Sequence, residues 1–408
     1  MALHFFGRLQ LKKKILILTF NYPPDLGAGS FKVAALVAAL REIEPEAQID
    51  VMTTSPNRYS VYDTEFLDYE QHKGLNVTRI RLPKHGGGIL GQIKAFIYYA
   101  VKVSSKTRGN YNLVFATSSR LMTAVVGAFM SRKLRCSFYL DIRDIFPDTM
   151  ASLLPAPLST FFKPLLFGLE RWVVSKAGTV NLVSEGFRDY FQSRYSGKRL
   201  TFFTNGIDDE FLVEREDQRS YRSNSSNRLL KILYAGNIGD GQGLHEIVPD
   251  LALQMKDELE FKIFGYGGRR DELLRRLNSQ NILNVSIADP IHRSDLIRHY
   301  EEADVLFVHL ADFEAFKKVL PSKIFEYAAT GKPIWAGVSG YCSDFLKKEV
   351  SNCAIFHPGD VAGAIQVFSG LEIKCEPRLK FMHKFSRKRI CYAMAQDILG
   401  LAREQKIF

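Results

Sequence analysis

Two series of short apolar runs, each alternating with stretches of helical periodicity, constrain the fold of this chain more than any other feature. In the first half, six runs have the composition of strands: residues 14–20, 49–53, 76–82, 111–116, 137–141 and 179–183. Helical patterns lie between most of them, for example over residues 30–41 and 161–175. Alternation of this kind predicts a doubly wound parallel sheet.

A second series of the same kind follows a polar segment. Residues 208–228 contain few large apolar residues, which is typical of a linker. After it come six further strand-like runs: residues 230–235, 259–264, 284–288, 304–310, 333–338 and 353–357. A chain of 408 residues is long enough for two separate cores. We therefore predict two Rossmann-like α/β domains, residues 1–207 and 229–376, facing across a cleft, with residues 377–408 as a C-terminal segment that is helical over 380–401.

The segment 320–333 has the pattern of a short helix with a defined start and end. Pro321 and Ser322 suit its first positions, and Gly331 suits the left-handed residue just beyond its end. The segment follows the apolar run 304–310. The helix should therefore begin near the carboxyl edge of a sheet, where open α/β folds bind ligands.

Three residues at the start of this helix are candidate ligand-binding residues. Backbone N–H groups near Ser322 and the charge of Lys323 would favour a phosphate. Glu326, about one turn further on, cannot bind phosphate, but its carboxylate can accept hydrogen bonds from vicinal hydroxyls such as those of a nucleotide ribose. The alternative is an ordinary amphipathic helix with solvated charges.

Three further strand-to-helix turns are rich in glycine. Gly27 and Gly29 follow the first strand, where a backbone can approach a ligand closely. The first strand of the second half leads into a turn whose glycines and amides could surround phosphate oxygens: Gly236, Asn237, Gly239 and Gln242. The next strand ends in Gly265 and Gly267, where a backbone could pass under a flat base. Together with the helix start at Ser322, these loops predict a site for a nucleotide diphosphate in the second domain.

Charged side chains follow directly after the strand 137–141. Arg143, flanked by Asp141 and Asp144, falls at the functional edge of the first sheet. It could pair structurally with these carboxylates, or it could contact sugar and phosphate. The sequence has no strict Asp-x-Asp metal motif and no Ser/His/Asp signature, so we expect neither a metal nor another cofactor.

The net charge of +11 is concentrated in one part of the chain. Residues 71–140 contain 12 Lys and Arg and no Asp or Glu. Such a surface attracts anionic lipid headgroups, pyrophosphates or nucleic acid. Bulky apolar and aromatic residues surround Lys94, which fits a helix at a membrane interface. A core-facing helix with a solvated basic side is the alternative.

The remaining composition indicates a cytoplasmic protein. The five cysteines are scattered without metal-ligand spacing, which predicts free thiols in a reducing compartment. No apolar run approaches the roughly 20 residues needed to span a bilayer. The N-terminus has neither the order nor the cleavage site of a signal peptide. We expect a cytoplasmic location, with peripheral contact to the inner face of the membrane through the basic region.

Landmarks in order along nearly the whole chain resemble those of one enzyme family. They are Tyr22-Pro23-Pro24 with Gly27 and Gly29, Arg143-Asp144-Ile145-Phe146-Pro147, Asn205-Gly206-Ile207-Asp208, Gly236-Asn237-Ile238-Gly239 with Gln242-Gly243-Leu244, Pro321-Ser322-Lys323 with Glu326-Tyr327, and His357-Pro358-Gly359-Asp360. With them the chain resembles GT-B-fold glycosyltransferases of family 4, a retaining family. It is more closely similar to the branch that builds bacterial O-antigen, capsule and exopolysaccharide repeats, which includes N-acetylfucosamine transferases.

The resemblance implies a fold, an activity and roles for the candidate residues. The second domain would bind a nucleotide sugar, UDP-linked and with N-acetylated amino sugars among the candidates, with Glu326 on the ribose and the Gly236 loop and Ser322 on the diphosphate. Gly27 and Gly29 would close on the donor, and the basic first domain would meet a lipid-linked saccharide or similar acceptor. The C-terminal helix would cross back onto the first domain. The leaving phosphate would assist the incoming hydroxyl.

The chain departs from the broad family pattern at three places. Of the family's common pair of glutamates only Glu326 is present, because Lys318 occupies the other position. Asn237 and Gln242 stand where Arg and Lys phosphate ligands are frequent, and Arg143 stands where His is usual before the Asp. We interpret these as specialisation within the O-antigen-like branch.

Two other functions remain as alternatives. A nucleotide-sugar epimerase or hydrolase of the same fold would consume the donor without an acceptor. A basic nucleic-acid-binding protein would show strongly salt-dependent binding to DNA or RNA. The absence of a basic-aromatic recognition module in the sequence favours the transferase, and we expect no nucleic-acid partner.

Overall fold

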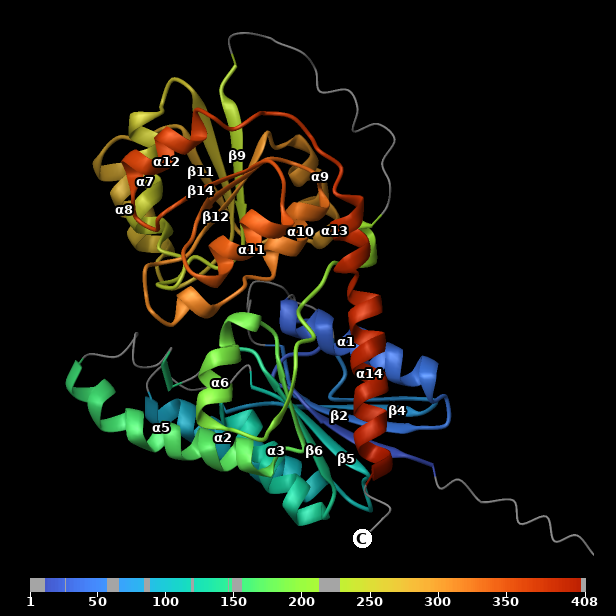
Figure 1. Ribbon diagram of the computed structural model, residues 1–408. Helices are drawn as coiled ribbons and strands as arrows, with labels where there is room; N and C mark the ends of the chain where they lie inside the picture. The colour runs from blue at the N-terminus through green and yellow to red at the C-terminus, as the bar shows by residue number, and fades with distance from the viewer. Residues whose placement is uncertain are drawn as a thin grey trace, which may run out of the picture.

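A computed structural model shows two α/β domains stacked one above the other, with the C-terminal helix running down one side (Figure 1). The structure describes residues 12–25, 27–56, 66–83, 89–118, 121–145, 147–148, 156–212 and 228–404. Most of the predicted linker, residues 213–227, lies outside the described residues. Sequence inspection predicted this two-domain architecture.

The first domain contains an eight-stranded sheet with the order β3-β4-β2-β1-β5-β6-β7-β8. Its strands are β1 (Lys14–Leu18), β2 (Gln48–Thr54), β3 (Tyr69–His72), β4 (Leu75–Ile80), β5 (Leu113–Thr117), β6 (Ser137–Ile142), β7 (Thr179–Leu182) and β8 (Arg199–Thr201). All neighbouring strands pair in parallel except β3 and β4, which form an antiparallel edge. The six predicted strands are present. The prediction omitted β3 and β8, because these partly exposed edge strands lack an apolar run.

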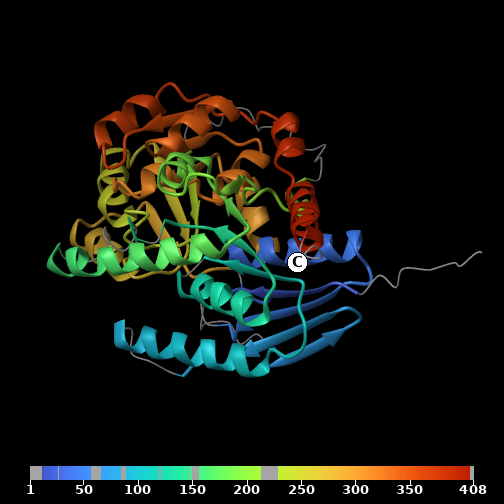
Figure 2. The ribbon, with the colours of Figure 1, turned by 60° about the horizontal axis from the view of Figure 1, so that its bottom comes forward.

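Helices cover both faces of this sheet (Figures 1 and 2). On one face, α2 (Ile89–Lys106), α3 (Leu121–Leu134) and α5 (Ala156–Lys176) pack over the side chains of Leu16 and Leu18. On the other face, α1 (Ala28–Ile43) packs over Ile15 and Ile17. Alternate residues of β1 thus enter opposite cores, as the pleat of a strand buried on both faces requires. The short α6 (Arg188–Arg194) precedes β8.

The second domain contains a six-stranded, entirely parallel sheet with the order β11-β10-β9-β12-β13-β14. Its strands match the six predicted runs: β9 (Leu230–Ala235), β10 (Leu259–Phe264), β11 (Val285–Ala288), β12 (Val305–His309), β13 (Ile334–Gly337) and β14 (Cys353–Phe356). One core lies under α7 (Leu244–Gln254), α8 (Arg270–Ser279) and α12 (Val361–Phe368). The other lies under α9 (Arg293–Glu302), α10 (Lys323–Ala329) and α11 (Tyr341–Glu349).

The C-terminal segment crosses from the second domain to the first. We predicted one helix over 380–401, but the structure has two, α13 (Leu379–Lys384) and α14 (Arg387–Glu404). The break occurs because Phe385 packs into the second domain against Phe325 and Phe345, with ring centroids 5.3 Å and 5.5 Å away. α14 then packs along α1 (Figure 1), which confirms the predicted return to the first domain.

The helix α2 combines features of both interpretations drawn from its sequence. Ala95, Phe96, Tyr99 and Val103 are buried against the sheet, as a core-facing helix requires. The opposite side exposes a row of apolar residues at helical spacing: Ile93, Ile97 and Val101, with relative exposures of 48%, 59% and 60%. The helix therefore has one apolar face in the core and a second in contact with solvent.

Three further features of the structure concern the cysteines, membrane-spanning helices and metal ligands. All five cysteines are free thiols, as expected. Within the part of the chain that the structure describes, no helix is both long enough and apolar enough to cross a membrane. The same part of the chain has no group of three or more His, Cys, Asp or Glu side chains that could hold a metal ion.

Candidate functional site

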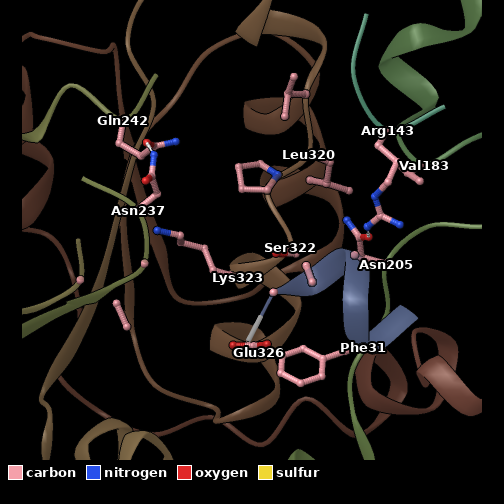
Figure 3. Close-up of a pocket in the computed structure, with 18 of the residues that line it drawn as sticks. Phe31, Arg143, Val183, Asn205, Asn237, Gln242, Leu320, Ser322, Lys323 and Glu326 are labelled. Atoms are coloured by element: carbon pink, nitrogen blue, oxygen red, sulfur yellow. Dashed lines mark hydrogen bonds between the residues drawn. The ribbon is translucent and has the colours of Figure 1, made fainter. Parts of the chain in front are cut away.

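A cleft of about 780 Å³ lies between the two domains. It opens at the carboxyl ends of strands from both sheets, which is where parallel α/β sheets place their ligand sites. Eleven of the thirteen predicted site residues line it: Gly27, Gly29, Arg143, Asp144, Gly236, Asn237, Gln242, Gly265, Ser322, Lys323 and Glu326. Figure 3 shows Asn237, Gln242 and Lys323 on one side and Arg143 with Asn205 on the other.

The loop after β9 forms part of the second-domain wall. Gly236 has a φ of +144° there, and a Cβ at this position would lie 2.8 Å from Nζ of Lys323. The backbone conformation therefore favours glycine, and any side chain here would displace the lysine ammonium. Asn237 donates from Nδ2 to Oε1 of Gln242 at 2.7 Å, so the two amides lie side by side facing the cleft (Figure 3).

A buried histidine fixes the position of this loop. His309, at the end of β12, donates from Nδ1 to the carbonyl of Gln242 at 2.7 Å. Its Nε2 accepts from the backbone N–H of Gly359 at 3.1 Å, which defines the neutral tautomer. Burial lowers the pKa of His309 to about 4, so the ring stays neutral at physiological pH. His309 thus positions Gln242, and its own side chain does not line the cleft.

Lys323 is the most unusual cation of the cleft. Its Nζ is buried, lies 3.6 Å from the centroid of the Tyr234 ring, and has no hydrogen-bond partner among the described residues. Burial lowers its pKa from 10.5 to about 7, opposed by the attraction of Glu326. The side chain points toward Asn237 and Gln242 (Figure 3). An ammonium group held this way is poised to receive an anion.

The helix α10 supplies both Lys323 and Glu326. It is seven residues long and ends before Gly331, whose φ of +74° is the left-handed conformation predicted from sequence. The hydroxyl of Tyr327 accepts from the backbone N–H of Ala235 at 3.0 Å, which fixes the helix to β9. Glu326 lies 3.3 Å from the guanidinium of Arg293, and burial raises its pKa while Arg293 opposes that rise.

The first-domain wall is built from the turn at Gly27 and Gly29 and from the residues after β6. Arg143 donates from a terminal nitrogen to Oδ1 of Asn205 at 2.6 Å, and another of its nitrogens lies 3.4 Å from Asp141. Asp141 is fully buried and also accepts from Lys32 and Asn181, at 3.2 Å and 2.6 Å. Arg143 is thus held by structural pairing and also lines the cleft, so the two interpretations of its sequence position are compatible.

Direct contacts join the domains at the rim of the cleft. Nζ of Lys318, in the short helix η4 (Phe316–Lys318), lies 3.1 Å from a carboxylate oxygen of Asp148 in the first domain. The backbone carbonyl of Lys318 accepts from the hydroxyl of Ser184 at 2.6 Å. Lys318 therefore makes an interdomain ion pair.

Two predicted residues do not line the cleft. A Cβ on Gly267 would lie 2.4 Å from the carbonyl oxygen of Ile238, and one on Gly239 would lie 2.6 Å from the amide of Asn237. Both glycines allow loop segments to pack closely, and neither lines the cleft. Sequence inspection missed Phe31 and Arg293, which do line the cleft. Arg293 follows the end of β11, so the strand-end rule used for the other loops could have found it.

Comparisons with known proteins identify the fold. No protein-family model and no curated sequence matches the chain. Among solved structures, sucrose-phosphate synthase from Thermosynechococcus elongatus is 15% identical, with a TM-score of 0.63 over 97% of both chains. The α,α-trehalose 6-phosphate synthase from Burkholderia multivorans is 8% identical, with a TM-score of 0.66 over 97% of this chain and 98% of that one. The fold is GT-B.

A third similar structure contains a nucleotide sugar. Anabaena HepE in complex with UDP-glucose is 17% identical, with a TM-score of 0.59 over 96% of this chain and 98% of that one. At these identities the shared property is the fold, with its two parallel-sheet domains. The match extends over both domains of all three proteins, so the cleft of the present chain lies within the shared architecture.

Proposed function

We propose that this protein is a glycosyltransferase that transfers a sugar from a UDP-linked donor to an acceptor bound by the first domain. The observation that carries the proposal is the buried, unpartnered ammonium of Lys323 in the interdomain cleft, beside the Gly236 loop and on the same short helix as Glu326. A buried cation without a hydrogen-bond partner is costly to fold, and a diphosphate bound in the cleft would supply strong acceptors for it.

The chemistry follows from how the two walls are charged. Lys323 and the amide of Gln242 would bind the diphosphate and stabilise the charge that develops on it as the bond to the sugar breaks. Glu326 would accept hydrogen bonds from the ribose. Arg143 and Asp144, with the Gly27–Gly29 turn, would hold the sugar and the incoming hydroxyl from the other side. Because Lys323 supplies the positive charge, we propose that transfer requires no metal or other cofactor.

The proposal extends to family and substrate. On the ordered landmarks of the sequence, we propose that the chain is a retaining glycosyltransferase of family 4, in the branch of O-antigen, capsule and exopolysaccharide enzymes. UDP-linked N-acetylated amino sugars are candidate donors, and a lipid-linked saccharide is the candidate acceptor. The solved complex of HepE with UDP-glucose has the same fold, which supports a UDP-sugar donor.

A membrane-peripheral location fits the acceptor side. The second apolar face of α2, formed by Ile93, Ile97 and Val101, lies on the domain that carries the excess of basic residues. Apolar side chains flanked by lysines at an exposed helix surface are typical of binding at the interface of an anionic bilayer. We therefore place the enzyme in the cytoplasm, on the inner face of the membrane.

The test is a transfer assay with purified protein. Each candidate UDP-sugar is incubated with and without lipid-linked saccharides, and released UDP and glycosylated product are measured, with Glu326→Ala as the inactive control. A transferase forms product only when acceptor is present, with the anomeric configuration of the donor retained. Donor consumption that is independent of acceptor would instead identify an epimerase or hydrolase.

A further inference from the structure

Arg293, the first residue of α9, lies at the junction of three carboxylates. One of its terminal nitrogens is 3.3 Å from Glu326, its Nε is 2.6 Å from Glu210, and it also pairs with Asp208. The side chain is only 16% exposed, so these charges interact with little screening by water. Glu326 belongs to α10, whereas Asp208 and Glu210 lie on the segment that connects the two domains.

The same guanidinium also reaches the first domain. It lies over the ring of Phe31 in α1, with 4.6 Å between the guanidinium carbon and the ring centroid, and over Phe211 at 5.0 Å. Phe31 and Glu326 lie next to each other in the cleft (Figure 3). One side chain of the second domain therefore contacts both the candidate ribose ligand and the helix that follows the Gly27–Gly29 turn.

Asp208 connects Arg293 to both chain crossings between the domains. It lies 2.6 Å from Arg387, the first residue of α14. Arg387 is fully buried and donates to the carbonyls of Asn205 and Gly206, at 2.9 Å and 3.0 Å. The backbone N–H of Ile207 donates to Phe385 at 2.7 Å. The crossings at 205–208 and 385–387 thus run side by side, and Asp208 is shared by the arginines on either side.

From this arrangement we infer that Arg293 is a positioning residue. It keeps the Glu326 carboxylate ionised and oriented for a nucleotide ribose. It also couples nucleotide binding at Glu326 to the hinge formed by residues 205–208 and 385–387. The inference rests on the proposed nucleotide-binding function. A ligand whose hydroxyls donate hydrogen bonds to Glu326 changes how strongly that carboxylate competes with Asp208 for the guanidinium, and Asp208 transmits the change to Arg387.

The electrostatic surroundings give a direction for the loss of Arg293. Burial raises the pKa of Glu326, and Arg293 is the strongest opposing influence. The other charged or titratable groups around Glu326 include Arg387, Asp208, Lys323, Tyr300 and Tyr327. Without Arg293 the carboxylate would take up a proton at a higher pH, and a protonated carboxyl is a poorer acceptor for two ribose hydroxyls.

Calorimetric titration of UDP tests the binding half of the inference. It uses the full-length wild type, Arg293→Gln and, as a matched control on the same helix, the exposed Arg298→Gln, at about pH 6 and about pH 8. We expect Arg298→Gln to bind as the wild type does. The ratio of the Arg293→Gln Kd to the wild-type Kd should be larger at the lower pH, where the variant carboxyl is more fully protonated.

Hydrogen exchange with saturating UDP tests the hinge half. On UDP binding, the backbone amides of residues 205–208 and 385–387 should become protected from exchange in the wild type, and less so in Arg293→Gln and Arg293→Lys. Lysine keeps the positive charge but cannot reproduce the planar, forked geometry of the guanidinium. If Arg293→Gln does not fold, as judged by circular dichroism, the Arg293→Lys exchange result decides the question.

The outcomes separate this inference from the proposed function. If neither UDP, GDP nor ADP binds to the wild type, the nucleotide-binding function is wrong and the inference is wrong with it. If UDP binds the wild type, but Arg293→Gln shows the same ratio at both pH values or wild-type protection of the hinge, only the role of Arg293 is overturned.

Discussion

Replacing Lys323 by methionine should remove nucleotide binding and at the same time stabilise the free protein. Methionine has a similar length and packs well against an aromatic ring, here that of Tyr234. In the wild type, burial lowers the pKa of Lys323 from 10.5 to about 7. A difference of about 3.5 corresponds to about 4 kcal/mol of unfolding free energy lost at pH 7. The pKa of about 7 already includes the attraction of Glu326. The contact of the ammonium with the Tyr234 ring, worth about 1–2 kcal/mol, is lost in addition, so we expect a net gain of about 2–3 kcal/mol.

The pH dependence of this gain has a defined sign. The unfolded chain keeps the lysine protonated up to about pH 10, whereas the folded chain releases the proton near pH 7. The wild type should therefore gain stability as the pH rises from about 7 to about 10, and Lys323→Met should lack this rise. The advantage of the variant is largest at and below pH 7 and disappears at high pH.

Denaturant unfolding followed by circular dichroism measures the stability, and titration with UDP measures the binding. Lys347→Met, at an exposed position of α11, is the matched control and should change neither quantity. The reasoning is wrong if Lys323→Met is less stable than the wild type at pH 7, because that would make the lysine a structural ion-pair partner. Undiminished binding of UDP by the variant would remove Lys323 from the site.

Two further predictions concern the donor and the membrane. Lys323 is about half neutral at pH 7 in the free protein, and a diphosphate favours its charged form. UDP binding should therefore take up a fraction of a proton, and the affinity for UDP should fall as the pH rises from about 7 to about 8.5. Titrations in buffers of different ionisation enthalpy measure the proton uptake, and zero uptake would contradict the buried ammonium. On the acceptor side, Ile97→Glu should weaken binding to vesicles containing anionic lipid by about tenfold or more without changing the affinity for UDP. The matched variant Leu283→Glu, at an exposed position of the second domain, should bind vesicles as the wild type does. Equal vesicle binding by all three proteins would show that α2 does not touch the bilayer.

Most of the fold could be predicted because buried parallel strands are short runs rich in apolar and β-branched residues, and these runs alternate here with stretches of helical periodicity. All six strands of the second sheet and six of the eight in the first have this signature. The edge strands β3 and β8 lack it, since one face or both contact water. The break between α13 and α14 depends on Phe385 packing with residues 40 to 60 positions away, which no local pattern contains.

The candidate site was predictable for a different reason. Loops at the carboxyl ends of parallel strands meet at one edge of the sheet. Gly236, Lys323 and Arg143 all lie in such loops or just after them, so this strand-end rule predicted that they would line one cleft, as they do. The strand-end rule does not distinguish glycines that line the cleft from glycines that let loops pack closely. For this reason Gly239 and Gly267 were included among the predicted site residues. The rule also could not find the pairing of Arg293 with Glu326, because a lone arginine gives no sign of its partner.

The most direct test of the account is calorimetric titration of UDP, GDP and ADP into the wild type and into Glu326→Ala. The account predicts that UDP binds one site per chain and that Glu326→Ala, although folded, loses most of this affinity. If none of the three nucleotides binds to the folded wild type, the interdomain cleft is not a donor site and the glycosyltransferase function is contradicted.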